Sequence, residues 1–493
     1  MARTSSDSRR PLVPLVVSIV LASTVLATGP AGADDVPTLR LFAAQSEVSV
    51  ERDGNGYVYL DPGVWITPVG GDFELRVGRA DYESPITVTQ VDSATGATLR
   101  SLPADPLDPW SGLGRFARIV VRGGDGRLVL RQTMTFCPNS WYQQRLSDQS
   151  PLTSSYPYFC GGGYFTRGMV WGIDHGWAAG VMDPGYYGLS WPAEGRRYTV
   201  TMSITPTWVD LLGIAPEDAV AEVQVEVVRG GTGGDEPPQP VAPQANQPYP
   251  AVPDVTQPPQ GSLPDLIALP GWGMSVYEGR RNKEFLAFNA TEWNEGPGTF
   301  IIEGFRAPDE PTMDAYQYFL VDGAPVGRAE IGALEFHSGG GHNHWHFQEF
   351  TEYSLLDAQR QEVLKSGKQS WCLVNTDAID LSVPNAFWQG FGQELFTSCG
   401  GPGALWIREV LDVGWGDTYS QYVSGQAFNI TGLPNGTYYV RVHVNPTGSI
   451  YEATADNNVE DRLIRIKGKP GDRRVVVPPW NGIDTEGCSF YCP

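Results

Sequence analysis

Short runs of β-strand character, separated by turns rich in glycine and proline, dominate this chain. Strand-like runs at 198–204 and 439–444 are each followed by a proline turn and a further run, at 221–228 and 459–466. Segments with the 3.6-residue period of a helix are scarce, and abundant glycine and proline favour frequent turns over long helices. The pattern therefore predicts an all-β fold.

The 493-residue chain exceeds what one hydrophobic core usually holds, which predicts two or more domains. Residues 229–261 are rich in glycine, proline and glutamine, a composition that favours an extended spacer. We therefore expect one β-sandwich domain over residues 34–228 and a second over residues 262–493, joined by this linker.

We expect residues 1–33 to be a secretory signal peptide. Basic residues open the chain, an apolar run follows at 11–27, and small residues at 31–33 offer a cleavage site. The apolar run is too short and too rich in helix breakers for a good membrane span. We expect the mature protein to be secreted, extracellular or associated with the cell wall.

An internal repeat relates the two expected domains. In each, a strand-like run leads into a cysteine and the next cysteine stands in a glycine run. Asp174-His175-Gly176-Trp177 in the first domain then matches Asp412-Val413-Gly414-Trp415 in the second. These collinear matches predict two copies of one β-sandwich, for which shared composition bias is the alternative explanation.

The repeat also bears on the six cysteines, which alone allow fifteen pairings. An exported chain can keep all of them oxidised. The repeated layout selects Cys137–Cys160 and Cys372–Cys399, and leaves Cys488–Cys492 as the third pair.

Three of the chain's six histidines stand two residues apart, at His342, His344 and His346. Because side chains alternate between the faces of a strand, all three imidazoles would leave one face. Neighbouring rings then start roughly 6.6–7 Å apart, so a slight kink lets them converge on one ion. Neutral imidazoles suit zinc, copper, iron or nickel, and copper(II) binds tightest. The alternatives are solvated strand histidines and a purification tag, although tags are contiguous and terminal.

The charge balance narrows the choice of partners. Acidic residues outnumber basic ones by 56 to 34, a formal net charge of −22. This argues against nucleic acid and anionic membrane surfaces and favours cationic partners through long-range attraction.

From about Leu263 to the C-terminus, several motifs occur in one order along the chain. They are His-x-His-x-His at 342–346, Gly367-Lys368-Gln369-Ser370-Trp371-Cys372-Leu373, Asp417-Thr418-Tyr419, Val444-Asn445-Pro446, and Glu452 followed by Asp456-Asn457-Asn458. In these motifs and their order the second domain resembles the catalytic domain of lysyl oxidases. The resemblance implies that the three histidines hold copper(II). It also implies that Lys368 and Tyr419 form lysine tyrosylquinone, in which the tyrosine is oxidised and the lysine amine adds to its ring.

The activity implied by the resemblance is oxidative deamination of primary amines, above all lysine side chains of cationic proteins or peptides. The amine becomes an aldehyde, dioxygen is consumed, and hydrogen peroxide and ammonia are released. Asp417 shares a strand face with Tyr419 if that segment is extended, which makes it the candidate general base; a turn carboxylate is the alternative. Some members bind calcium, and Asp265, the Leu266 carbonyl and Asp456, Asn457 and Asn458 offer hard oxygen ligands here.

Two other functions are compatible with parts of the pattern. His342-x-His344 with Glu349 resembles half of the first cupin motif, which implies a metal-dependent oxygenase; a non-enzymatic, secreted copper-binding protein is the other alternative. Only an enzyme of the lysyl oxidase type requires both Lys368 and Tyr419. By the repeat, the first domain has Thr133 and Val181 at these two positions, so we expect it to be a degenerate, non-catalytic copy.

Overall fold

The computed structural model describes residues 36–52, 57–60, 62–108, 110–140, 142–147, 149–151, 153–182, 188–189, 195–229, 248–307, 310–339, 342–366, 370–389, 399–421 and 425–487. The chain divides into two units, Met1–Val36 and Pro37–Pro493. The predicted signal peptide, most of the predicted linker, Lys368 and the Cys488–Cys492 pair lie outside the described residues. No helix in the described part of the chain is long and apolar enough to cross a membrane.

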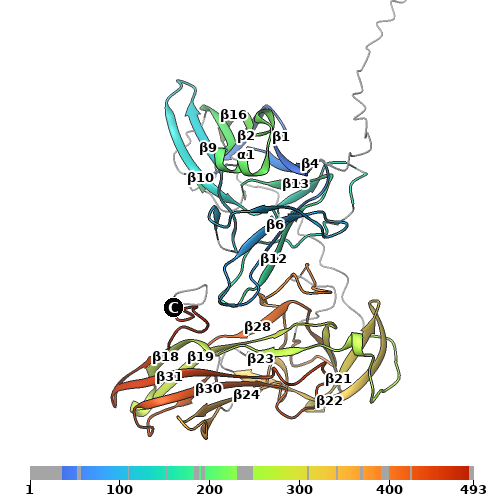
Figure 1. Cartoon of the computed structure of the whole chain (residues 1–493), viewed down its shortest axis with the longest axis vertical. Coiled ribbons are helices and arrows are strands. Elements are labelled where there is room, and N and C mark those ends of the chain that lie inside the picture. Colours follow the sequence, from blue (N-terminus) through green and yellow to red (C-terminus); the bar gives the residue numbers. More distant parts are fainter. Residues whose placement is uncertain are drawn as a thin grey trace, which may run out of the picture. The chain divides into compact units, whose positions relative to one another are not determined.

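The prediction of an all-β fold is confirmed (Figure 1). The described strands of the first half, which covers residues 36–229, form three sheets. Their strand orders are β1 (Thr38–Ala43), β4 (Val64–Val69), β13 (Trp177–Gly180), β11 (Gln143–Arg145); then β12 (Gly168–Ile173), β5 (Phe73–Gly78), β6 (Thr87–Val91), β7 (Thr98–Leu102); and β10 (Leu128–Phe136), β9 (Gly112–Gly123), β15 (Arg197–Ile204), β16 (Val220–Arg229), β2 (Glu47–Arg52), β3 (Val58–Tyr59), β14 (Gly188–Leu189), with β8 (Leu107–Asp108) on β9.

The described strands of the second half, which covers residues 248–487, also form three sheets. Their strand orders are β17 (Leu266–Ala268), β19 (Glu284–Asn294), β28 (Trp415–Tyr419), β26 (Asp377–Ala378), with β18 (Trp272–Glu278) and β29 (Ala427–Asn429) on β19; then β27 (Trp406–Leu411), β20 (Phe300–Phe305), β21 (Thr312–Val321), β22 (Ala324–Gly339), β23 (His342–Phe347); and β25 (Glu362–Lys365), β24 (Thr351–Leu356), β30 (Gly436–Val444), β31 (Val459–Lys469), β32 (Asp472–Val476).

The two halves share their strand orders. The path β1-β4-β13-β11 corresponds to β17-β19-β28-β26, β12-β5-β6-β7 to β27-β20-β21-β22, and β10-β9-β15-β16 to β25-β24-β30-β31. A backbone bond recurs as well, from Thr205 N to Phe116 O and from Asn445 N to Phe350 O, each 2.8 Å long. This correspondence agrees with the internal repeat in the sequence. That the first half is a degenerate copy stays a prediction.

Helices are short and lie between strands. The α-helix α1 spans Pro206–Leu212 and connects β15 to β16, where the sequence indicated only a proline turn. Three 3-10 helices cover Pro216–Asp218, Gln260–Ser262 and Arg280–Asn282. Buried Trp208 anchors α1, because its indole N–H donates to Gly114 O at 2.9 Å.

The end of the predicted linker already packs on the second half. Val255 N donates to Arg328 O at 2.8 Å, and Arg328 N donates to Pro253 O at 3.0 Å. Tyr249 N donates to the buried Glu303 carboxylate at 3.1 Å. Ordered contacts with β20 and β22 therefore begin before residue 262, where we expected the domain to start.

Strands β19 and β28 pair with each other in the buried interior of the second half. β19 is buried along nearly its whole length, as a strand covered on both faces should be. Its antiparallel register with β28 sets Glu292 opposite Asp417 and Ala290 opposite Tyr419. Side chains at Asp417 and Tyr419 share a face, because they are two residues apart on one strand.

Candidate active site

Two of the three predicted metal ligands converge on β23. His344 is partly exposed and His346 is fully buried, and their Nε2 atoms lie 2.9 Å apart. Two nitrogens bound to one ion at about 2.0–2.1 Å, and about 90° apart as in tetragonal copper(II), are separated by about 2.9 Å. The two ring nitrogens are in hydrogen-bond contact here, and the same separation suits adjacent positions on one ion. The backbone of His342 begins β23, and its side chain lies outside the described part.

The surroundings of β23 hold these rings in place. Phe347 exchanges two backbone hydrogen bonds with Trp371, at 2.6 and 2.9 Å. Trp345, on the other face of the strand, donates its amide N–H to Cys399 O and its indole N–H to Gly401 O, at 2.8 and 2.9 Å. On β22, His337 lies with its ring centroid 4.5 Å from that of His346.

Tyr419 lies beside the histidines at the end of β28. Its ring centroid is 6.4 Å from that of His346 and 4.1 Å from the Trp371 ring. The phenol oxygen accepts a hydrogen bond from Cys372 N at 2.8 Å. Burial raises the pKa of Tyr419 well above its ordinary value, and the nearby Asp417 carboxylate raises it further. The phenol is thus protonated at neutral pH.

Three fully buried carboxyl groups lie near Tyr419. They belong to Asp417, Glu292 and Glu409. Burial raises the pKa of each well above the ordinary range, and the proximity of Asp417 raises those of Glu292 and Glu409 as well. Backbone N–H groups oppose the shift at two of them, Val374 N at Asp417 (3.3 Å) and Leu373 N at Glu409 (3.1 Å). Both oxygens of Glu292 lack a hydrogen-bond partner among the described residues.

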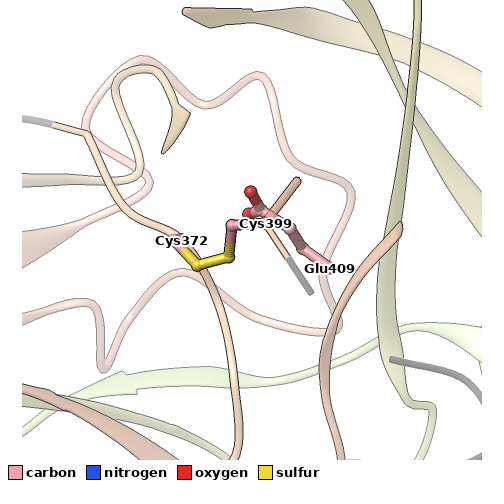
Figure 2. Close-up of side chains that lie close together, drawn as sticks. All are labelled: Cys372, Cys399 and Glu409. Carbon is pink, nitrogen blue, oxygen red and sulfur yellow. A yellow bond between two sulfur atoms is a disulfide. The ribbon is translucent and has the colours of Figure 1, made fainter. Parts of the chain in front are cut away.

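Glu409 lies next to a disulfide. Figure 2 shows Cys372 and Cys399 joined, with the Glu409 carboxylate beside them. Among the described residues this is the one group of three or more cysteine, histidine and acidic residues whose donor atoms all lie within 4.8 Å of one another. It does not suit a metal, because cysteine binds metals as a thiolate and both sulfurs are committed to the disulfide. The predicted Cys137–Cys160 disulfide is present too.

Lys368 lies outside the described residues, so its approach to Tyr419 stays a prediction. Three positions further along the sequence, the ring of Trp371 packs against Tyr419. Two other polar residues near the motifs lie elsewhere. Glu349 is exposed in a turn. His443 lies on β30 opposite Glu352.

A second group of oxygen atoms lies where calcium was predicted. Asp265 Oδ1 accepts from Asn457 Nδ2 at 2.9 Å, and Glu452 Oε1 accepts from Asn458 Nδ2 at 2.7 Å. The Oδ1 atoms of Asn457 and Asn458 are buried and have no hydrogen-bond partner in the described part of the chain. Burial raises the pKa of both Asp265 and Glu452. Orphaned amide oxygens beside two desolvated carboxyls suit a hard cation.

The structure changes the membership of that group. Asp456 is exposed, whereas Glu452 also accepts the backbone N–H of Leu266 at 3.3 Å. Glu452 is therefore a further candidate ligand beside those that the sequence analysis named, and the role of Asp456 stays a prediction.

Glu292 and Glu409 were not found by the sequence analysis. Neither lies in a motif. Glu292 reaches this region through the pairing of β19 with β28, and Glu409 through the hydrogen bond that it accepts from Leu373 N. The available signal was weak, a single acidic residue within an otherwise uncharged stretch, as in Phe285–Asn294 for Glu292.

Comparisons with known proteins bear on this half of the chain. A family model described as lysyl oxidase matches residues 327–472. The protein-lysine 6-oxidase of Sus scrofa is 32% identical over 129 residues, 26% of this chain and 45% of that protein. The human protein-lysine 6-oxidase is also 32% identical over 129 residues, 26% of this chain and 27% of that protein. Lysyl oxidase homolog 2 of Gallus gallus is 30% identical over 130 residues, 26% of this chain and 15% of that protein. The chain thus matches less than half the length of each of these relatives.

Proposed function

We propose that the protein is a secreted, copper-dependent amine oxidase of the lysyl oxidase type, because residues 327–472 match the lysyl oxidase family model. It converts a primary amine, dioxygen and water into an aldehyde, ammonia and hydrogen peroxide. The observation that best supports this is the 2.9 Å separation of the His344 and His346 Nε2 atoms beside Tyr419.

His342, His344 and His346 would hold copper(II), and Tyr419 with Lys368 would form the quinone. Together these groups would supply a two-electron acceptor for the amine, which dioxygen would then reoxidise. The chain's own residues place the reactants. Cys372 N–H fixes the Tyr419 oxygen, Trp371 covers one side of the ring, and burial among apolar side chains excludes water.

Asp417 is the residue we assign to proton transfer. Its carboxylate accepts the proton that leaves the carbon next to the substrate nitrogen. Burial raises its pKa, which makes the deprotonated group a stronger base than a solvated carboxylate. Glu292, opposite Asp417 on β19, adds to the same desolvated acidic environment.

Lysine side chains of cationic proteins or peptides are the substrates we favour, because the chain's net charge of −22 attracts them. A peroxide-coupled assay with a lysine-rich peptide and with n-butylamine, on copper-loaded and copper-stripped protein, tests the function. We expect peroxide only with copper, and a lower KM for the peptide. Protein that binds copper and oxidises neither amine would support the non-enzymatic copper-binding alternative.

Asp417→Asn should lower kcat by about 10²–10⁴-fold, the usual contribution of a general base, and retain copper. The unchanged enzyme should show kcat rising with pH through an apparent pKa above the ordinary carboxyl range, because protonated Asp417 cannot accept a proton. Asp314→Asn, an exposed position on β21, is the control and should behave as wild type. An undiminished kcat in Asp417→Asn would rule Asp417 out as the base.

Calcium should stabilise the second half. With calcium at about 100 times its Kd, linkage predicts about 2.7 kcal/mol and a Tm higher by several degrees. Differential scanning calorimetry with calcium or with a calcium-selective chelator measures the shift. Asn457→Ala should abolish the shift and Asp456→Asn should keep it. Equal Tm values in calcium and chelator would argue against this site.

A further inference from the structure

The first half contains a cavity of about 640 Å³, within the size range of small-molecule sites. It lies between the start of β9, the end of β10 and α1, and none of its lining residues belongs to the candidate active site. Two arginines, several threonines and one aspartate supply its polar lining. The lining residues used below are Asp105, Arg115, Arg118, Thr133, Thr135 and Thr207.

A bulge in β9 presents the first arginine. Ala117 pairs with Met134 and Leu113 with Phe136, so three residues of β9 stand opposite one of β10. Arg115, in the middle of this bulge, has a φ of 50°. Two side chains from the β15–α1 connection fix the bulge: Thr205 Oγ1 donates to Arg115 O and Trp208 Nε1 donates to Gly114 O, each at 2.9 Å. Bulges of this kind redirect a side chain.

Comparison with the second half shows which features of this region occur in both halves. Counting from the equivalent bonds at Phe116 and Phe350, Glu349 stands at the position of Arg115 and also has a positive φ, of 58°. Glu352 stands at the position of Arg118. The left-handed backbone before the shared bond is therefore common to both halves, although Glu349 lies in a turn and Arg115 in a strand. The first half carries the opposite charge at both positions.

The first half also differs in what surrounds these charges. Glu352 has a salt bridge to Lys365 at 2.5 Å, whereas no carboxylate of the described residues lies within salt-bridge distance of Arg115 or Arg118. The helix α1 walls the cavity, and the described β30–β31 connection, residues 445–458, contains no helix in its place.

Both arginines are exposed, and the β9–β10 hairpin that carries them also holds Arg122, Arg127 and Arg131. This region is therefore locally basic in a chain of net charge −22. Guanidinium groups recognise oxyanions through paired N–H donors. Thr133, opposite Arg118 in the β9–β10 register, and Thr207 offer hydroxyls, and Asp105 offers an acceptor for hydroxyl protons.

We propose that this cavity binds an acidic saccharide. The carboxylate or phosphate of the sugar lies against Arg115 and Arg118, and the sugar hydroxyls lie against the threonines and Asp105. The first half then carries a carbohydrate site of its own, separate from the amine chemistry of the second half.

Isothermal titration calorimetry on the full secreted chain tests this with D-glucuronate, glucose 6-phosphate, D-glucose and inorganic phosphate. We expect saturable binding of at least one acidic sugar, at least 10-fold tighter than D-glucose or phosphate. Failure of both acidic sugars to bind, or equal binding of D-glucose, would overturn the proposal. Phosphate binding as tight as that of the sugars would overturn the saccharide assignment as well.

Variants separate binding from folding. Arg118→Gln should weaken binding at least 10-fold, and Arg127→Gln, in the exposed β9–β10 turn, should leave it unchanged. Arg115→Gly should weaken binding by a similar factor without lowering Tm, because glycine adopts the left-handed backbone of this position at no steric cost. Undiminished binding in both Arg118→Gln and Arg115→Gly would contradict the assignment.

Discussion

Tyr419→Phe is expected to abolish amine oxidation while one copper per chain is retained. The variant keeps the ring beside His346 and Trp371 and removes only the oxygen from which a quinone can form. Copper-loaded, aerated wild-type protein should give a coloured adduct with phenylhydrazine, and the variant none. Loss of the acceptor for Cys372 N should also cost about 1–3 kcal/mol of stability, measurable by thermal unfolding.

Tyr353→Phe is the matched control, since this tyrosine is also fully buried nearby. It should retain the phenylhydrazine adduct and turnover. In digests of active, reduced wild-type protein, one peptide should join Lys368 to Tyr419. Separate, unmodified peptides from active protein would contradict the cofactor assignment.

His346→Ala is expected to lower copper affinity at least about 100-fold, because loss of even a partner of a metal ligand costs 10- to 100-fold. Turnover should disappear with the metal. His346 is fully buried, so the substitution also leaves a cavity and should lower Tm. Copper content after dialysis, measured by atomic absorption, checks the first expectation.

His175→Ala, at an exposed position in the first half, is the control and should keep stoichiometric copper. Because His346→Ala also disturbs packing, His344→Ala provides a second test at a partly exposed position. Full copper occupancy in both variants would show that the metal, if any, lies elsewhere.

The sequence was sufficient for the features that depend on local period and spacing. The alternation in His342–Phe347 predicted a strand, and the structure brings His344 and His346 together on it. The repeated layout predicted the disulfides at Cys137 and Cys372. Both kinds of feature are encoded by residues within one segment or by its internal copy.

Features that depend on strand register could not be predicted in this way. Glu292 meets Asp417 only because β19 and β28 pair in one register, and a shift by one residue would turn Glu292 to the opposite face. The helix α1 was also missed. Its seven residues are too few for a helical period to stand out, and buried Trp208 holds it by a tertiary contact.

The N–H that meets the Tyr419 oxygen belongs to a half-cystine, and this sets an order of assembly. Until Cys372 is joined to Cys399, no covalent link ties that segment to the chain around Cys399. Oxidative folding should therefore come first, then copper, then any maturation of Tyr419. If the protein is exported as we propose, a chain kept in a reducing compartment is expected to mature more slowly than the exported one.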